Sequence, residues 1–351
     1  MKINKLALIK IVLVSIFFNF YFPTIAQKVS IPVMNWLTFE QAAEAVKANP
    51  RPVLIYFYNP ANDSSDLMLQ TTFTQKEVCL YSYTKFHSIK FDITSSRDIT
   101  FLNGKVYHKD PSKPFNDLAY FLLGTNPDVP STLMYDDQNK GFAFKGFKDY
   151  SEMICAMVYI SENVNKTARY EVWRPAYFRT FPTDRKANRI PMAVNWISLK
   201  DALIKNKQNP KGIFLTFYAK SNASSTVMLV NAFSHNKVAG YLNDNFYCVR
   251  IDVNTTDTIV WDKKYMNPKS DDNIHELPKA FMKGNVKLPA IFFFDGANNL
   301  ILNESSYLSP EALYMLSNYV VSKEYEKQAF ADFIKTFKFE FEDIVPREHQ
   351  Q

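Results

Sequence analysis

The sequence predicts an α/β protein built from two copies of one domain. Two observations support this prediction: matching residues recur at a fixed spacing, and each copy alternates strand-like apolar runs with helix-like segments. The length of 351 residues fits two domains, and 47% hydrophobic residues are enough to bury a core. The composition therefore excludes wholesale disorder, and with only 8 glycines it also excludes a collagen-like chain.

The internal repeat has a constant offset of 160 residues. The matching residues include Trp36, Asn49, Asn62, Ser65, Met68, Phe73 and Asp92, which recur as Trp196, Asn209, Asn222, Ser225, Met228, Phe233 and Asp252. Chance does not hold one offset over so many positions. Later in the chain Pro130 matches Pro289, so one residue is lost in the more variable middle. We therefore predict domains at residues 27–185 and 186–345, followed by a tail at 346–351.

Each copy presents the same elements in the same order. In the first copy Thr38 can cap a helix, and the continuous apolar run Val53–Tyr58 predicts a strand buried on both faces. A polar turn then leads to a helix that carries Met68, the next strand ends at Asp92, and a further strand follows Pro130. The second copy repeats this order around Ser198, Ile213–Tyr218, Met228, Asp252 and Pro289.

The N-terminus has the pattern of a secretory signal peptide. Three lysines precede a short apolar run at residues 11–18, and Ala26 offers a small residue before a cut that leaves Gln27 first. A membrane anchor is the alternative, but the run is short for a span and Asn19 interrupts it. We expect residues 1–26 to be removed and the mature chain to have no transmembrane span. The expected location is the periplasm, with an outer-membrane-associated complex or secretion as alternatives.

The ordered set of residues resembles the exported members of the thioredoxin superfamily. The resemblance covers nearly the whole mature chain and rests on a helix-opening Trp, a Phe-Tyr strand end, a Met, a Phe, an Asp and a Pro in each copy. These are Trp36, Phe57, Tyr58, Met68, Phe73, Asp92 and Pro130, and Trp196, Phe217, Tyr218, Met228, Phe233, Asp252 and Pro289. The resemblance implies two thioredoxin-like domains, each a central mixed sheet flanked by helices. It also implies cis Val129-Pro130 and Leu288-Pro289 bonds.

The two active-site cysteines that the resemblance implies are absent from both copies. Counting back from the methionines places them at Asn62 and Ser65, and at Asn222 and Ser225. Thiol–disulfide exchange needs a thiolate nucleophile and a resolving thiol, and neither an amide nor a hydroxyl can replace them. We therefore predict no catalytic residues at these degenerate active-site positions, where Asn and Ser serve as helix caps.

The remaining chemistry-bearing residues support no other site. Cys79, Cys155 and Cys248 have apolar neighbours and are far apart in sequence, so we predict three buried thiols, although a lone reactive cysteine stays an alternative. No histidine or cysteine pair has zinc-ligand spacing, and no glycine-rich phosphate loop occurs, so we expect no metal and no cofactor. Removal of the three signal-peptide lysines lowers the net charge from +6 to about +3, which is too weak for nucleic-acid binding.

Two kinds of segment leave more than one interpretation open. The segment 169–181 is rich in aromatic and basic residues, and we favour a helix packed on its own domain over a partner-binding element. The inserts at 95–128 and 254–287 are long for loops, so they are binding elements, disordered segments or helices packed on their domains.

The sequence therefore predicts a redox-inactive protein of the bacterial envelope that binds other polypeptides as a scaffold, folding helper or complex subunit. The resemblance implies binding at Val129-Pro130 and Leu288-Pro289, because thioredoxin-like proteins present a backbone there that can pair with an extended peptide. One alternative is a thiol-dependent enzyme that uses a lone cysteine. Another is a purely structural subunit of an envelope assembly.

Overall fold

The computed structural model describes residues 33–182, 193–261, 263–267 and 272–338, which all fall in one compact unit. The expected signal peptide at 1–26, the expected boundary between residues 185 and 186 and the tail at 346–351 lie outside these ranges. Within these ranges, no helix combines the length and the apolar character that crossing a membrane requires.

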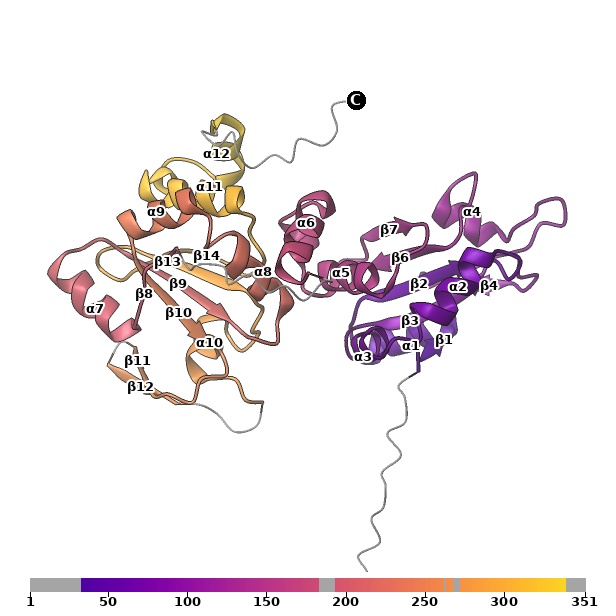
Figure 1. Cartoon of the computed structure of the whole chain (residues 1–351), viewed down its shortest axis with the longest axis horizontal. Helices are drawn as coiled ribbons and strands as arrows, with labels where there is room; N and C mark the ends of the chain where they lie inside the picture. Colours follow the sequence, from indigo (N-terminus) through magenta and orange to yellow (C-terminus); the bar gives the residue numbers. More distant parts are fainter. Residues whose placement is uncertain (1–32, 183–192, 262, 268–271, 339–351) are drawn as a thin grey trace, which may run out of the picture. The chain divides into compact units, whose positions relative to one another are not determined.

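The first repeat contains one five-stranded mixed sheet. Its strands are β1 (Trp36–Leu37), β2 (Val53–Tyr58), β3 (His87–Asp92), β6 (Ser131–Tyr135) and β7 (Gly141–Lys145). They lie in the order β1-β3-β2-β6-β7 (Figure 1). β1, β3 and β2 are parallel, whereas β6 and β7 are antiparallel to their neighbours. The predicted central strand is confirmed, because β2 pairs on both sides and five of its six residues are buried.

Helices cover both faces of this sheet. They are α1 (Phe39–Ala48), α2 (Asp63–Thr71), α3 (Lys76–Lys85), α5 (Tyr150–Ser161) and α6 (Tyr170–Thr180), with a short 3-10 turn η1 (Val164–Lys166). Side chains of β2 alternate between two apolar clusters: Leu54 and Tyr56 join the one that contains α3 and α5, and Ile55 and Phe57 join the one that contains α1. The predicted cap of α1 is confirmed, since Thr38 forms a capping box with Gln41.

The second repeat has the same topology. Its strands are β8 (Trp196–Ile197), β9 (Ile213–Tyr218), β10 (Tyr247–Asp252), β13 (Ala290–Phe294) and β14 (Leu300–Glu304), in the order β14-β13-β9-β10-β8. Its helices are α7 (Leu199–Gln208), α8 (Ala223–Asn231), α9 (Asn236–Asn245), α11 (Pro310–Val321) and α12 (Phe330–Thr336), with the 3-10 turn η2 (Glu324–Glu326). The two five-stranded sheets are separate, so the predicted fold class of two α/β units, each a mixed sheet flanked by helices, is confirmed.

Both proline predictions are also confirmed. The Val129-Pro130 and Leu288-Pro289 bonds are cis, and each proline directly precedes a central antiparallel strand of its sheet.

Each insert folds into a β-hairpin and a short helix. The elements are β4 (Ile99–Thr100), β5 (Val106–Tyr107) and α4 (Asp117–Leu123) in the first repeat, and β11 (Ile259–Trp261), β12 (Lys264–Met266) and α10 (Glu276–Phe281) in the second. Leu118 and Leu277, on the two helices, are fully buried, so each insert contributes to its domain's core. The described parts of the inserts are therefore ordered, and of the three interpretations offered above, packing on the domain describes them best.

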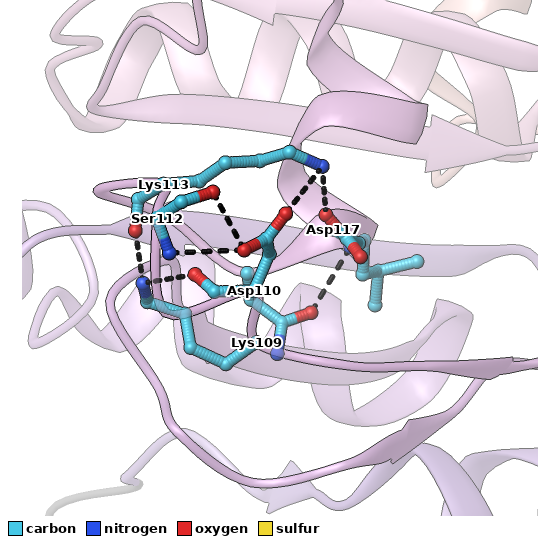
Figure 2. A network of polar contacts seen from close by, with 7 residues as sticks. Lys109, Asp110, Ser112, Lys113 and Asp117 are labelled. Atoms are coloured by element: carbon cyan, nitrogen blue, oxygen red, sulfur yellow. Dashed lines mark hydrogen bonds and ion pairs between the residues drawn. The ribbon is translucent and has the colours of Figure 1, made fainter.

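Figure 2 shows how polar contacts order the loop between β5 and α4. Lys113 Nζ lies 2.8 Å from Asp117 Oδ1 and 3.6 Å from Asp110 Oδ2. Asp110 also accepts hydrogen bonds from the Ser112 hydroxyl and backbone N–H, at 2.7 and 2.9 Å. Ser112 and Lys113 are exposed and the two aspartates are partly exposed, so these contacts order the loop at the surface of the domain.

Candidate functional site

The first candidate site is the turn that joins β2 to α2. Asn62, at the first expected cysteine position, caps α2, because its side-chain oxygen accepts a hydrogen bond from Ser65 N at 2.8 Å. Ser65, at the second position, is fully buried, and its carbonyl accepts a hydrogen bond from the Tyr56 hydroxyl at 2.8 Å. Asp63 and Ser64, which lie between them, are exposed. The turn therefore presents an open surface with a capped helix start and no sulfur.

The sheet register brings the cis-proline to the same end of the sheet as this turn. Phe57 pairs with Ser131 across β2 and β6, so Pro130 lies where β2 ends. Within the described ranges, no hydrogen bond engages the backbone of Val129. The predicted residues of the first repeat therefore gather around one sheet end, next to a backbone segment that has no pairing partner.

The second candidate site has the same local geometry. Asn222 caps α8, and its side-chain oxygen accepts hydrogen bonds from Ser225 N at 2.8 Å and from Ser225 Oγ at 2.5 Å. Phe217 pairs with Ala290, which places Pro289 at the end of β9, and the described residues form no hydrogen bond with the backbone of Leu288. The two repeats therefore bring their predicted residues together in the same way.

The surroundings of the two turns differ, because the first repeat covers the turn of the second. Glu162, at the end of α5, accepts hydrogen bonds from Ser224 N at 2.7 Å and from Ala223 N at 3.2 Å. Ser224 is fully buried, whereas Ser64, at the matching position, is exposed. A carboxylate at a helix N-terminus satisfies free N–H groups and complements the helix dipole. The first turn of α8 has no acid of its own, so Glu162 supplies one from the other repeat.

Helix α6 also contributes to this contact, which corrects part of the sequence interpretation. Trp173 packs on its own domain as expected, since its Nε1 donates to the Cys155 carbonyl at 3.2 Å. The same ring lies 5.2 Å from the Tyr307 ring of the second repeat. Asn231, on α8, donates to the Ala176 carbonyl at 3.3 Å. The helix therefore packs against both repeats, not only against its own.

Sequence reasoning missed Glu162, Asn231 and Tyr307, which make this contact between the repeats. A signal for two of them exists in the repeat alignment. Glu162 matches Ser322 and Asn231 matches Thr71, so residues of different size or charge stand at otherwise equivalent positions. The copies also differ at many positions outside the contact, such as in β2 and β9, so this signal is weak.

The buried Glu162 carboxyl predicts a pH-dependent stability. Burial raises its pKa above the ordinary value, although hydrogen bonds from Ser224 and Ala223 oppose that shift. Between the ordinary and the raised pKa the folded state binds more protons than the unfolded state. The free energy of unfolding therefore falls as pH rises through that window, and the contribution is fully present below it.

We expect Glu162→Gln to remove this part of the pH dependence, because the amide does not titrate and still offers one oxygen to the N–H groups. Urea unfolding of both proteins between about pH 4 and pH 8 measures the difference. Glu162→Ala serves as the control, since it loses both acceptors and should cost about 1–3 kcal/mol at every pH. Identical pH profiles for wild type and Glu162→Gln would contradict the prediction.

The three cysteines occupy environments that suppress thiol chemistry. Cys79, Cys155 and Cys248 are all free and buried, as predicted. Burial raises the pKa of Cys79 and raises the pKa of Cys155 and of Cys248 to about 12. Because the thiolate is the reactive form, such thiols are poor nucleophiles near neutral pH. Across the described ranges no group of three His, Cys, Asp or Glu residues is placed to hold a metal ion.

Comparisons with known proteins give remote likenesses to structures of the thioredoxin fold. A structure of the oxidoreductase DsbH is 17% identical, covers 41% of this chain and 97% of its own, and has a TM-score of 0.28. A disulphide isomerase from Xylella fastidiosa is 18% identical, covers 40% of this chain and 95% of its own, and has a TM-score of 0.27. A thioredoxin-fold protein from Helicobacter pylori is 13% identical, covers 36% of this chain and 80% of its own, and has a TM-score of 0.29. No family model and no curated protein matches the chain.

The fold class follows from the chain's own geometry. Two mixed sheets with the same strand order, each with a helix-capping turn after its central parallel strand and a cis-proline before the next antiparallel one, define two thioredoxin-like units.

Proposed function

We propose that this chain is a redox-inactive tandem thioredoxin-like protein of the bacterial envelope that binds other polypeptides. The observation that supports it best is at the first repeat: an exposed, sulfur-free turn lies at the sheet end where the backbone of Val129 has no partner among the described residues. An extended polypeptide can add its own backbone hydrogen bonds there, in the manner of an added strand. The basic and apolar pattern of the N-terminus supports export.

The first repeat is the better candidate for this role. Its turn is open, whereas Glu162 covers the turn of the second repeat at Ala223 and Ser224. We therefore assign polypeptide binding to the region around Val129-Pro130 and keep Leu288-Pro289 as a weaker second position.

A thiol-dependent enzyme is the competing proposal, and the environment of the cysteines disfavours it. All three thiols are buried, and burial raises their pKa values. A purely structural subunit remains the other alternative, and it predicts no affinity for an extended polypeptide.

We expect the purified protein to bind a denatured, alkylated protein used as an extended-polypeptide probe, and to show no insulin reduction above the uncatalysed rate. Val129→Pro should weaken binding at least about 10-fold, because proline has no N–H to donate. Val129→Ala keeps that donor and should bind like wild type. Fluorescence anisotropy of the labelled probe measures each affinity, and far-UV circular dichroism checks each fold.

Two further variants distinguish the proposals. Leu288→Pro makes the matched change in the second repeat and should weaken binding less than Val129→Pro. Replacement of Cys79, Cys155 and Cys248 by alanine should leave binding unchanged in a folded protein. Insulin reduction by the wild type, or loss of the cellular role in the folded cysteine-free variant, would favour the enzyme. Absence of any binding to the probe would favour the structural subunit.

A further inference from the structure

The contact between the repeats joins two unlike surfaces. We call the surface on the second repeat the leading surface. It lies on α8 and the loop before α11 and consists of Ala223, Ser224, Val227, Asn231 and Tyr307. We call the surface on the first repeat the trailing surface. It runs from the end of α5 through α6 and consists of Glu162, Thr167, Trp173, Ala176 and Thr180. A contact between unlike surfaces is heterologous, so a tandem pair leaves one copy of each surface unused.

The first repeat carries an uncovered leading surface. Leu67 is 50% exposed, whereas Val227, at the matching position, is 0% exposed. Phe147, two residues before the N-cap of α5, is 40% exposed, whereas Tyr307, two residues before the N-cap of the matching helix α11, is 0% exposed. These two large apolar side chains therefore face solvent at positions where the other repeat buries its own.

The second repeat carries an uncovered trailing surface. Val321, the last residue of α11, is 37% exposed. Ser322 and Lys327, which match Glu162 and Thr167, are exposed as well, whereas Glu162 and Thr167 are partly buried. The chain therefore has an unused leading surface in one repeat and, at the end of α11 and in the turn after it, an unused part of the trailing surface in the other, whereas Phe333, at the position of Trp173, is buried in its own repeat.

The polar groups on the two unused surfaces are compatible with each other. At the existing contact, Glu162 on the trailing side meets the neutral Ala223 on the leading side. At the unused surfaces, Ser322 stands at the trailing position of Glu162 and Asp63 stands at the leading position of Ala223. This pair of positions therefore again contains one acid and one neutral residue.

Further charges favour the same pairing. The unused leading surface has Asp66 beside Asp63 in the first turn of α2. The unused trailing surface has the exposed Lys323 and Lys327, with Glu324 and Glu326 between them, and Glu324 lies 2.9 Å from Lys327. Lys323 is therefore the lysine of the trailing surface that can pair with Asp63 or Asp66 of the leading surface, and such opposite charges promote association.

We propose that a second copy of this chain docks head to tail, with its first-repeat leading surface on the second-repeat trailing surface of its neighbour. The contact would repeat the one already present between the two repeats. Because the surfaces are unlike, the assembly continues beyond a dimer, as a closed ring or an open filament. This self-association goes beyond the proposed binding of other polypeptides, and it would cover the turn at Asp63 and Ser64 that is open in the single chain.

Sedimentation velocity of the purified protein tests the proposal. We expect the weight-average mass to rise at least about twofold over the monomer between roughly 10 and 300 µM, with no plateau at the dimer. The rise should be smaller in about 0.5 M salt, which screens exposed charges. A monomer throughout this range, or a closed dimer with a plateau, would overturn the proposal.

Variants at the two surfaces provide the sharper test. Leu67→Asp alters only the leading surface, and Val321→Asp with Lys323→Glu alters only the trailing surface. Each variant alone should be a monomer, whereas a mixture should give a heterodimer and nothing longer, because only one intact pair of surfaces remains. Ile204→Asp is the matched control, since Ile204 is 47% exposed on α7, and it should assemble like wild type. Assembly by either single-surface variant, or a mixture that stays monomeric, would refute the head-to-tail arrangement.

Discussion

Replacement of Trp173 by alanine should cost about 3–5 kcal/mol of the free energy of unfolding, the range for removal of a large buried aromatic side chain. Trp173 is 0% exposed, donates to the Cys155 carbonyl at 3.2 Å and packs 5.2 Å from the Tyr307 ring. The variant loses this packing on both sides, and it leaves the Cys155 carbonyl without its indole donor. The loss should therefore reach both repeats.

We also expect Trp173→Ala to change the form of the unfolding transition. With the contact weakened, the two repeats should unfold in separate steps, whereas tightly coupled units unfold together. Urea denaturation followed by fluorescence, together with scanning calorimetry, measures both the free energy and the number of transitions.

Phe333→Ala is the matched control for this experiment. Phe333 stands at the equivalent position of the second repeat, is 8% exposed and packs against Tyr319 and Phe337 of its own repeat. Its replacement should cost stability and leave the coupling between the repeats intact. A loss below about 1 kcal/mol for Trp173→Ala, or equal effects of the two variants on coupling, would show that the ring does not join the repeats.

The second large effect concerns the accessibility of the two turns. A cysteine introduced by Ser64→Cys should react with a neutral maleimide at a rate close to that of a free thiol. One introduced by Ser224→Cys should react at least about 100-fold more slowly, because labelling then requires a local opening of roughly 3 kcal/mol. Ser64 is exposed, and Ser224 is fully buried beneath Glu162.

This pair of variants contains its own controls. The two serines stand at equivalent positions of equivalent helices, so local chain geometry does not distinguish them. The wild-type chain gives the background from its buried thiols. Adding Glu162→Ala to the Ser224→Cys variant should speed its labelling, because the covering side chain is gone. Equal rates for the two single variants would contradict the covering of the second turn.

The features that could be predicted from sequence are those with a local cause. The strand at Val53–Tyr58 can be predicted from a continuous apolar run in the sequence, because both of its faces are buried. Asn62 and Asn222 were predicted as caps because an amide oxygen beside a helix start has a nearby N–H to accept from. The two helix-capping turns were therefore located correctly in both repeats.

Features that depend on distant neighbours could not be predicted in the same way. The apolar face of α6 shows that the helix packs, but no pattern indicates that Trp173 also meets Tyr307 from the other repeat. In the sequence, Glu162 looks like any other polar residue that follows a helix, because the N–H group that it binds, that of Ser224, belongs to the other repeat. In the inserts, the two-residue strands β4 and β5 are too short to show an alternating pattern.

The cover that Glu162 places over the second turn has a consequence for how the two copies tolerate substitution. At Asp63 and Ser64 a new side chain meets solvent, so size and charge can vary with little cost to folding. At Ala223 and Ser224 the same changes meet a packed surface with a carboxylate above it. The two equivalent turns therefore differ in what they tolerate: in a deep mutational scan that selects for folding, the first should accept most residues, and the second should accept only small or neutral ones.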